Sequence, residues 1–237
     1  PLVENIPLLS NLLKSPVFAT LFFSFALIGV MNGANFIDGM NGLATLFFLG
    51  ALCGCVTLSF VVGDLHSILV LIPWIILMTC FLIFNYPYGK LFLGDSGAYL
   101  MAILISVWLI DFFSRHQQIS SWNAVLILIY PLLEVVYSVI RKIYQGKSPF
   151  FPDREHLHIK VFDMINAATK KPFYANNITT VFLAVLWLSP ALAVQFVYNS
   201  QIGISICIVI MIVSYILLNT FTPALGSQVV QVKRVKK

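Results

Sequence analysis

Charged residues are scarce in this sequence. Asp, Glu, Lys and Arg make up 10% of its 237 residues, while hydrophobic residues make up 59%. A soluble domain usually contains about 25% charged residues, because its surface must be hydrated. The scarcity excludes an ordinary soluble domain, and the long unbroken runs of Leu, Ile, Val and Phe favour a protein embedded in a bilayer.

Cysteine is also rare, and the basic residues are dispersed. The four cysteines all fall inside apolar runs, so neither a disulfide framework nor a zinc site is expected. The net charge is +5, but the Lys and Arg residues form no stripe with exposed aromatic residues between them. No nucleic-acid-binding groove is expected, because such a groove needs that stripe.

Several apolar runs are long enough to cross a bilayer as helices, for which about 17 to 25 residues are needed. They cover residues 17–34, 42–62, 67–84, 97–113, 122–140, 177–198 and 201–221. These runs are too long and too uniform for barrel strands. The sequence therefore predicts an all-α, polytopic membrane helix bundle with about seven transmembrane helices, in a single domain over residues 1–237.

Lys and Arg gather on one side of the predicted membrane. The other side carries only Lys14 and Arg115. By the positive-inside rule, the richer side faces the cytoplasm. Segments 35–41 and 85–96 and a hydrophilic loop at 141–176 are expected on that side. Its basic residues are Lys90, Arg141, Lys142, Lys147, Arg154, Lys160, Lys170, Lys171, Lys233, Arg234, Lys236 and Lys237.

The first group of polar residues, at 32–44, places Asn32, Asn35, Asp38 and Asn41 at a helix end. Spacings of three residues keep such side chains together on successive turns. Glycines among them let a ligand approach the backbone closely. A polar turn between two helices is the simpler alternative, but it does not require so many amide and carboxylate groups.

The second group, at 85–100, contains Asp95 at the predicted start of a helix. Helix N-termini favour anions, so Asp95 could be no more than an N-terminal cap. Alternatively it is a ligand for Mg²⁺, which typically takes one or two protein carboxylates together with phosphate oxygens and water.

The third group, at 148–160, contains His156 and His158 beside Arg154. A zinc pair is not expected, because no cysteine and no third histidine accompany them. Imidazoles beside a guanidinium suit phosphate oxygens, and a solvated charged loop is the alternative. Glu134, inside the fifth predicted span, is expected to hydrogen-bond another helix, with a contact to lipid phosphate as the alternative.

These three groups, in this order, resemble motifs of the polyprenyl-phosphate N-acetylhexosamine-1-phosphate transferase family, and its WecA-like branch more than its MraY branch. The stretch NFIDGMNGLA is similar to the family's Asn-x-x-Asp-Gly-x-Asp/Asn-Gly motif, FLGDSG to its Gly-Asp-[ST/V]-Gly motif, and PDREHLH to its histidine-rich loop. The resemblance covers nearly the whole chain.

The resemblance implies a multi-pass enzyme of the bacterial inner membrane with its active site facing the cytoplasm. Such an enzyme transfers N-acetylhexosamine 1-phosphate from a UDP-sugar to polyprenyl phosphate and releases UMP, as the first membrane step of O-antigen, teichoic acid or related polysaccharide synthesis. The implied partners are UDP-N-acetylhexosamine, polyprenyl phosphate and the membrane, with a homodimer also compatible. The implied cofactor is Mg²⁺, for which Mn²⁺ can substitute.

Roles for single residues also follow from the resemblance. Asp95 resembles the family's magnesium ligand, and Asp38 an aspartate near the diphosphate. Phe92 offers a face on which the uracil ring could stack. The implied catalytic residues are Asp38, Asp95, His156 and His158, and the implied substrate-binding residues are Asn35, Asn41, Asn85, Phe92 and Arg154.

Three features depart from the family pattern. Asn41 stands where peptidoglycan-type members have Asp, and Ile159 replaces a further histidine. The family's Asp-Asp-rich loop, expected upstream of the first span, does not occur here. We therefore expect the chain to be the C-terminal part of a larger family domain and to be inactive alone. A non-catalytic relative and a membrane transporter are the alternatives, although a transporter would need polar residues near the middle of several spans.

Overall fold

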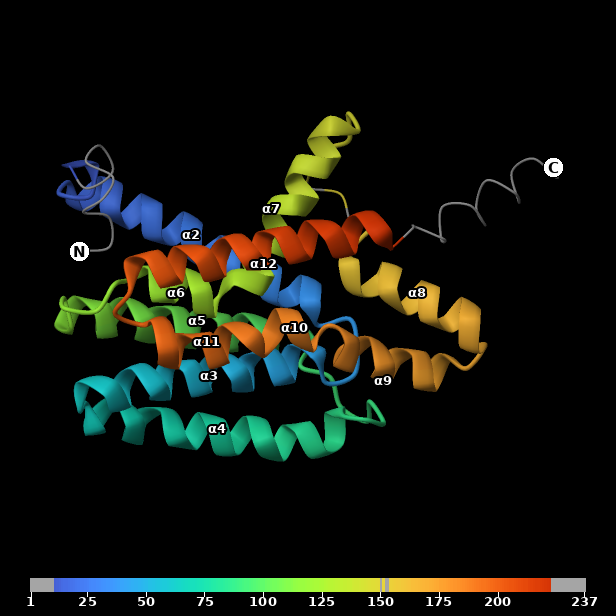
Figure 1. The fold of residues 1–237 in the computed structure, drawn as a ribbon, viewed down its shortest axis with the longest axis horizontal. Helices are drawn as coiled ribbons and strands as arrows, with labels where there is room; N and C mark the ends of the chain where they lie inside the picture. The colour runs from blue at the N-terminus through green and yellow to red at the C-terminus, as the bar shows by residue number, and fades with distance from the viewer. Residues whose placement is uncertain (1–10, 150, 152–153, 223–237) are drawn as a thin grey trace.

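The structure is a computed structural model that describes residues 11–149, 151 and 154–222. Within these ranges the chain is helical and contains no strand. The all-α fold expected from the sequence is thereby confirmed for the described part of the chain. The helices, labelled as in Figure 1, are α2 (Pro16–Ile37), α3 (Leu43–Val62), α4 (Leu65–Asn85), α5 (Gly94–Arg115), α6 (Trp122–Ile127), α7 (Ile129–Tyr144), α8 (Leu157–Thr169), α9 (Pro172–Phe182), α10 (Ala184–Trp187), α11 (Ser189–Val197) and α12 (Gln201–Phe221).

Six helical segments among the described residues are long and apolar enough to cross a membrane. Five of them are the single helices α2, α3, α4, α5 and α12, and the sixth, Pro172–Val197, combines α9, α10 and α11. In Figure 1 these segments run along the long axis of the molecule. The polytopic bundle is confirmed, with six candidate spans in place of the expected seven.

The predicted span at 122–140 accounts for the difference. The structure divides it at Leu128 into α6 and α7, and α7 points away from the other helices (Figure 1). Pro131 explains the break, because its ring clashes with the carbonyl of Ile127 and it has no N–H to donate. Neither piece is a candidate span, so the described chain has no continuous fifth transmembrane helix of the kind predicted.

Helices α2 and α7 approach each other closely at Gly33. A Cβ atom at this position would collide with the backbone carbonyl of Pro131. In a bilayer the helices gain little hydrophobic free energy by associating, so small residues that allow close backbone packing contribute most through van der Waals contact. This contact fixes the start of α7 beside the C-terminal half of α2.

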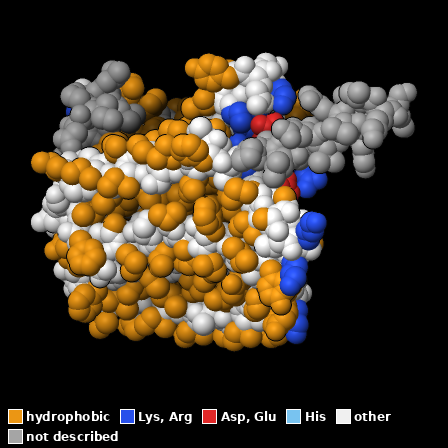
Figure 2. Space-filling model, turned by 45° about the vertical axis from the view of Figure 1, so that its right-hand side comes forward, with side chains coloured by type: hydrophobic (Ala, Val, Ile, Leu, Met, Phe, Trp, Pro, Cys, Tyr) orange, Lys and Arg blue, Asp and Glu red, His pale blue; other side chains and the backbone are white. Residues whose placement is uncertain are grey.

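The buried core lies among α3, α5 and the junction of α6 and α7. Phe47, Phe48, Phe112 and Tyr130 are among its largest fully buried side chains. By contrast, only a few residues of α4 and of α12 are buried. Figure 2 shows this hydrophobic flank, with Lys and Arg gathered at one end of the molecule. Such a surface suits helices that face lipid tails.

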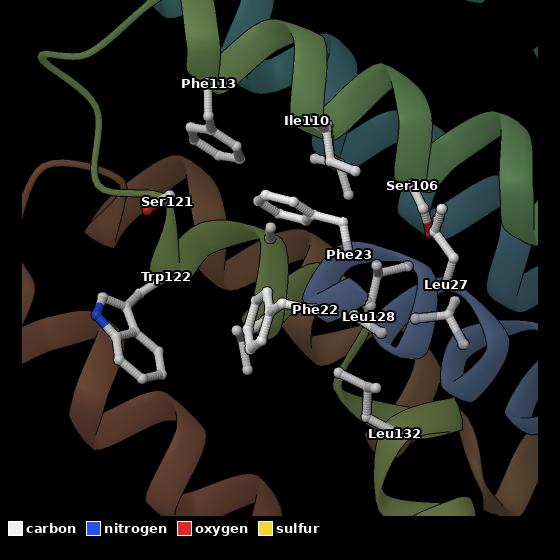
Figure 3. A pocket seen from close by; sticks show the side chains of 15 residues that line it. Phe22, Phe23, Leu27, Ser106, Ile110, Phe113, Ser121, Trp122, Leu128 and Leu132 are labelled. Atoms are coloured by element: carbon white, nitrogen blue, oxygen red, sulfur yellow. The ribbon is translucent and has the colours of Figure 1, made fainter. Parts of the chain in front are cut away.

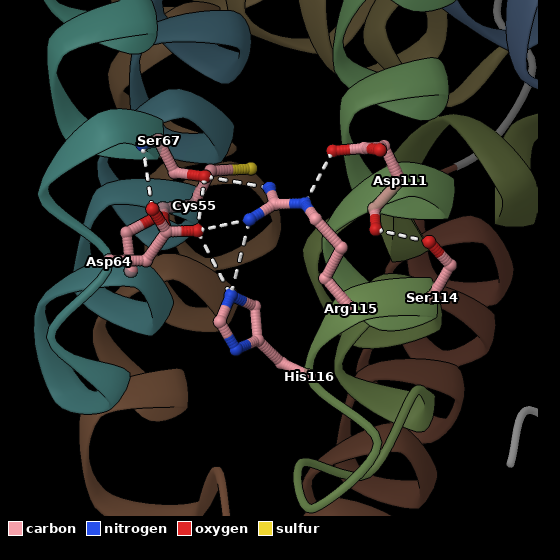
Figure 4. A network of polar contacts seen from close by, with 8 residues as sticks. Cys55, Asp64, Ser67, Asp111, Ser114, Arg115 and His116 are labelled. Atoms are coloured by element: carbon pink, nitrogen blue, oxygen red, sulfur yellow. Dashed lines mark hydrogen bonds and ion pairs between the residues drawn. The ribbon is translucent and has the colours of Figure 1, made fainter.

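The ends of α2 and α4 and the starts of α3 and α5 meet at one end of the bundle. The opposite end carries the α3–α4 turn and the end of α5, which a polar network joins (Figure 4). There the Asp64 carboxylate accepts hydrogen bonds from Ser67 and, at 2.6 Å, from Arg115. It also pairs with the His116 ring at 2.9 Å. This network connects neighbouring helices far from the sequence motifs.

Candidate functional site

Asp38 and Asp95 lie together although they are far apart in the sequence. The Asn35 side-chain amide donates a hydrogen bond to Asp95 Oδ1 at 2.6 Å. The backbone N–H of Gly94 donates to Asp38 Oδ2 at 2.9 Å. Each aspartate is thus held by the segment that carries the other. The first and second polar groups of the sequence therefore form one site, between the end of α2 and the start of α5.

Local helix geometry places both carboxylates. Asp38 is the C-cap of α2 and its N–H bonds to the carbonyl of Asn35, so the two side chains project from the same turn. Asp95 lies in the first turn of α5, where free amide groups and the helix dipole favour a negative charge. The N-cap of α5 is Leu93, with no side-chain capping bond. Asp95 is therefore not the N-cap residue of α5, although its place in the first turn also favours a negative charge.

The electrostatics of the pair favour a cation. Burial raises the pKa of the Asp38 carboxyl, the Gly94 hydrogen bond opposes this, and the negative charge of Asp95 raises it further, to about 6. The Asp95 side chain is exposed. Two neighbouring carboxylates repel each other when both are ionised, so a positive charge between them would relieve the repulsion.

The oxygen donors of this pair fit Mg²⁺ or Mn²⁺. Magnesium is usually bound through one or two carboxylates, and substrate phosphates and water complete its coordination. The part of the chain that the structure describes has no group of three or more His, Cys, Asp or Glu residues that could hold a metal ion. A closed, all-protein site such as structural zinc requires is therefore not formed by these residues.

Asn85, predicted to contact uridine, braces the loop that leads to Asp95. Its side-chain oxygen accepts hydrogen bonds from the Gly42 N–H at 2.8 Å and the Thr45 hydroxyl at 2.9 Å. Its amide group donates to the carbonyl of Leu91 at 2.6 Å. The side chain is buried. In this structure it connects the start of α3 and the end of α4 with the 86–93 loop, and its contact with uridine stays a prediction.

Asn41 has a similar bracing position. Its backbone N–H donates to the side chain of Asn176, its side-chain amide to the carbonyl of Pro87, both at 2.8 Å, and its own carbonyl accepts from Thr180. Asn176 and Thr180 belong to α9 and lie outside the three polar groups of the sequence. Their spacing of four residues, which puts both on one face of a helix, was the available signal.

Phe92 and Arg154 are accessible to a ligand. The Phe92 side chain is 54% exposed and lies in the loop directly before α5. Arg154 is also exposed, before the start of α8. An exposed ring three residues before Asp95 in the chain is available for stacking with a base. The predicted roles of both residues stay predictions.

His158 is buried against the turn that follows Asp38. Its ring leaves no room for a side chain on Gly39. Burial lowers the pKa of His158, the charge of Glu134 opposes this, and His156 lowers it further, to about 4. The ring is therefore neutral at physiological pH. In this conformation His158 attaches the histidine loop to the first polar group.

His156, the N-cap residue of α8, pairs with the buried Glu134 of α7. Its Nδ1 lies 3.2 Å from Glu134 Oε2. The ring also packs against Phe36, with ring centroids 4.5 Å apart, and lies nearly parallel to His158. The expected partner of Glu134 on another helix is therefore a histidine of the third polar group.

The basic residues at the end of α7 hold the same loop. The Lys142 ammonium donates to the carbonyls of Pro149 and, at 2.7 Å, Phe151. Arg141 pairs with Glu155 at 2.7 Å. Burial would raise the pKa of Glu155, but hydrogen bonds from Arg141 and Gln145 outweigh it and lower the pKa. These contacts attach the histidine loop to the end of α7. A loop that was merely charged and solvated would not need them.

An apolar cavity lies elsewhere in the bundle (Figure 3). Its volume is about 230 Å³. Phe22 and Phe23 from the first half of α2, Phe113 from the last turns of α5, and Trp122 of α6 contribute to its lining. The cavity is therefore separate from the carboxylate pair, which lies at the other ends of α2 and α5.

Residues 3–113 match the model of a family described as glycosyl transferase family 4. The matched segment contains Asp38 and Asp95 and ends before the histidine loop. The chain is also 32% identical, over 60% of its length, to an undecaprenyl-phosphate alpha-N-acetylglucosaminyl 1-phosphate transferase from Thermotoga maritima. It is 31% identical over 60% of its length to the Escherichia coli protein of that name.

A third relative is the decaprenyl-phosphate N-acetylglucosaminephosphotransferase of Mycobacterium leprae, with 27% identity over 58% of the chain. These matches cover 42%, 39% and 39% of the three relatives. The chain therefore spans about two fifths of the length of the curated relatives that it matches. No solved structure matches the chain significantly.

Proposed function

We propose that the whole protein transfers N-acetylhexosamine 1-phosphate from a UDP-sugar to polyprenyl phosphate, because residues 3–113 match the model of glycosyl transferase family 4. The names of its relatives describe N-acetylglucosaminyl 1-phosphate transfer to undecaprenyl or decaprenyl phosphate. The observation that carries the proposal is the joining of Asp38 and Asp95 at one end of an apolar bundle. In the reaction, an oxygen of polyprenyl phosphate attacks the β-phosphorus of the UDP-sugar, and the bond to UMP breaks.

Phosphoryl transfer requires mainly positioning and neutralisation of charge. A bound Mg²⁺ would supply the charge that offsets the diphosphate. Asp95, accessible and oriented by Asn35, would bind the ion, and Asp38 would add a second carboxylate. Phe92 would stack on the uracil, and Arg154 and His156 would contact phosphate oxygens. Asn41 and Asn85 would hold the loop on which Phe92 lies.

The site has to be reached by one soluble and one membrane-embedded substrate. Asp38 and Asp95 lie at helix ends, and the basic residues that would attract a nucleotide gather at the same end (Figure 2). We propose that this end faces the cytoplasm of a bacterial cell, at the surface of the inner membrane, because Lys and Arg accumulate on the cytoplasmic side of membrane proteins.

A transporter is the alternative from another class. Transport sites are built from polar groups near the bilayer midplane, often where helices are interrupted. The carboxylate pair described above is instead formed at the ends of α2 and α5. A site at the ends of the spanning helices, and not at their middle, favours an enzyme that works at the membrane surface.

The test is magnesium-dependent release of UMP from UDP-N-acetylglucosamine by the full reading frame that contains this chain, reconstituted with undecaprenyl phosphate. Release that requires both the lipid and the metal supports the proposal, and its absence from a folded, inserted protein contradicts it. Residues 1–237 alone should bind the nucleotide without turning it over, which equilibrium binding of UDP-N-acetylglucosamine measures. Turnover by this segment alone would contradict that expectation.

A further inference from the structure

We propose that Glu134 positions His156 for contact with a phosphate group of the substrate. The inference rests on the proposed function and extends it to a residue of α7 outside the three polar groups. The two side chains are 1% and 8% exposed, and Oε2 of the carboxylate lies 3.2 Å from Nδ1 of the ring. Glu134 would act through His156 and would not itself touch the substrate.

A carboxylate is costly to bury in an apolar bundle unless it is paired. Glu134 is paired with His156, and Tyr215 of α12 interacts with the same group. The pairing joins α7, which points away from the bundle, to the start of α8. If Glu134 served only to pack α7, its partner would not have to be a histidine of the loop.

The carboxylate selects the protonation site of the ring. A carboxylate at Nδ1 accepts a hydrogen bond from that nitrogen, so Nδ1 carries a proton. Nε2, on the other side of the ring, is then the nitrogen that can turn to a ligand. Phe36 and His158, which pack against the ring, restrict its plane. With its orientation and its Nδ1 proton both fixed, the ring has little freedom to lose when a phosphate binds.

His158 does not share this arrangement. It is buried with its Nε2 against Gly39, and its pKa of about 4 keeps it neutral. Its Nδ1 has no hydrogen-bond partner among the described residues. The two histidines therefore have separate tasks. His158 seats the loop on the turn after Asp38, while His156 has the carboxylate that would stabilise it when it contacts an anion.

The first measurement is a double-mutant cycle in the full reading frame, with UMP release as the readout. Glu134→Gln keeps the size of the side chain and removes its charge. We expect it to lower kcat about ten- to a hundredfold, the cost of losing the partner that orients a histidine. In the double variant with His156→Ala the loss should be no greater than for His156→Ala alone, because residues that act as a unit are not additive. Additive losses would overturn the proposal.

Ser138→Ala is the matched control for packing of α7, because Ser138 is buried one turn from Glu134 and makes only a long hydrogen bond, 3.3 Å, from Arg141, which keeps its ion pair with Glu155. It should leave kcat nearly unchanged and show no coupling to His156. If Ser138→Ala lowers kcat as much as Glu134→Gln does, the effect belongs to α7 packing and the proposal is wrong.

The second measurement does not depend on activity. In protein labelled with ¹⁵N-histidine, the His156 signals should show Nδ1 protonated in the unsubstituted protein, and this preference should weaken in Glu134→Ala. An unchanged pattern would overturn the positioning role even if transfer activity is found. Conversely, if the unsubstituted protein releases no UMP but the pattern changes as expected, the transferase proposal fails and the orienting contact stands.

Discussion

The imidazole of His158 lies so close to Gly39 that a Cβ atom on Gly39 would collide with Nε2 of the ring. This contact brings the loop before α8 onto the turn that follows Asp38. The two segments are distant in the sequence, and their contact requires that position 39 carry no side chain. The first and third polar groups thus depend on each other for their placement.

Gly39→Ala should therefore displace the histidine loop while leaving the helices intact. We expect the KM for the UDP-sugar to rise at least about tenfold, a loss on the scale that misplacing a positioned group can cause. Steady-state kinetics measure the change, and circular dichroism checks the helix content. The double variant Gly39→Ala with His158→Ala removes the collision. If the two losses simply add in it, contact between these residues is not the cause.

Gly33→Ala tests the contact between α2 and α7. The new methyl group would meet the backbone carbonyl of Pro131, which cannot rotate away as a side chain could. We expect destabilisation of about 1 to 3 kcal/mol, the usual cost of overpacking, measured by thermal unfolding in detergent. Gly29→Ala is the control on the same helix, since a Cβ there would meet nothing within 4 Å. Equal effects of the two substitutions would contradict the packing argument.

Asp95→Asn should lower UMP release at least about a hundredfold, the scale of losing one strong electrostatic contact in a transition state. Expression and thermal stability should change little, because the side chain is exposed. Asp111→Asn removes an exposed carboxylate from the other end of the same helix and should retain activity. Activity of Asp95→Asn near that of the unsubstituted protein would remove Asp95 from the metal site.

The apolar runs predicted most of the fold because a membrane helix has to satisfy its own backbone over a fixed length. For the run at 122–140 the prediction of one continuous span is wrong. Its hydrophobicity is sufficient for a span, but Pro131 interrupts the backbone hydrogen bonds, and Gly33 allows the start of α7 to pack closely against α2. A hydropathy profile of the sequence contains no information on the break at Pro131 or on the contact at Gly33.

The sequence motifs indicate segments that meet at the candidate site, but they do not separate side chains that could face a ligand from side chains that hold loops in place. Asn41 and Asp38 look equivalent as polar residues three apart, yet Asn41 bonds to α9 and to the loop before α5, and Asp38 borders Asp95. Such differences arise from long-range contacts. The sequence singles out Glu134 because a charge in an apolar run is costly, but its partner His156 is 22 residues away and is identified only by the three-dimensional structure.

At the end of the bundle away from the candidate site, Asp64 should make stability depend on pH (Figure 4). Burial would raise the pKa of Asp64, but hydrogen bonds from Ser67, His116 and Arg115 outweigh it and hold the pKa below its usual value. A carboxyl whose pKa is lowered by folding stabilises the protein above its unfolded pKa, about 3.9, and loses that contribution as pH falls through the folded pKa.

Asp64→Asn should consequently unfold at a lower temperature than the unsubstituted protein at pH 7, because it removes a negative charge whose side chain is only 9% exposed and leaves Arg115 without this partner. The difference in melting temperature should stay constant from pH 7 to about pH 5 and shrink below about pH 4, where the unfolded chain begins to bind the proton first. Asp111→Asn, which removes the more exposed carboxylate that Arg115 also contacts, should lower the melting temperature less at pH 7. Scanning calorimetry in detergent from pH 7 to pH 3 measures both. A difference for Asp64→Asn that grew as the pH fell would mean that the carboxylate does not stabilise the end of α5.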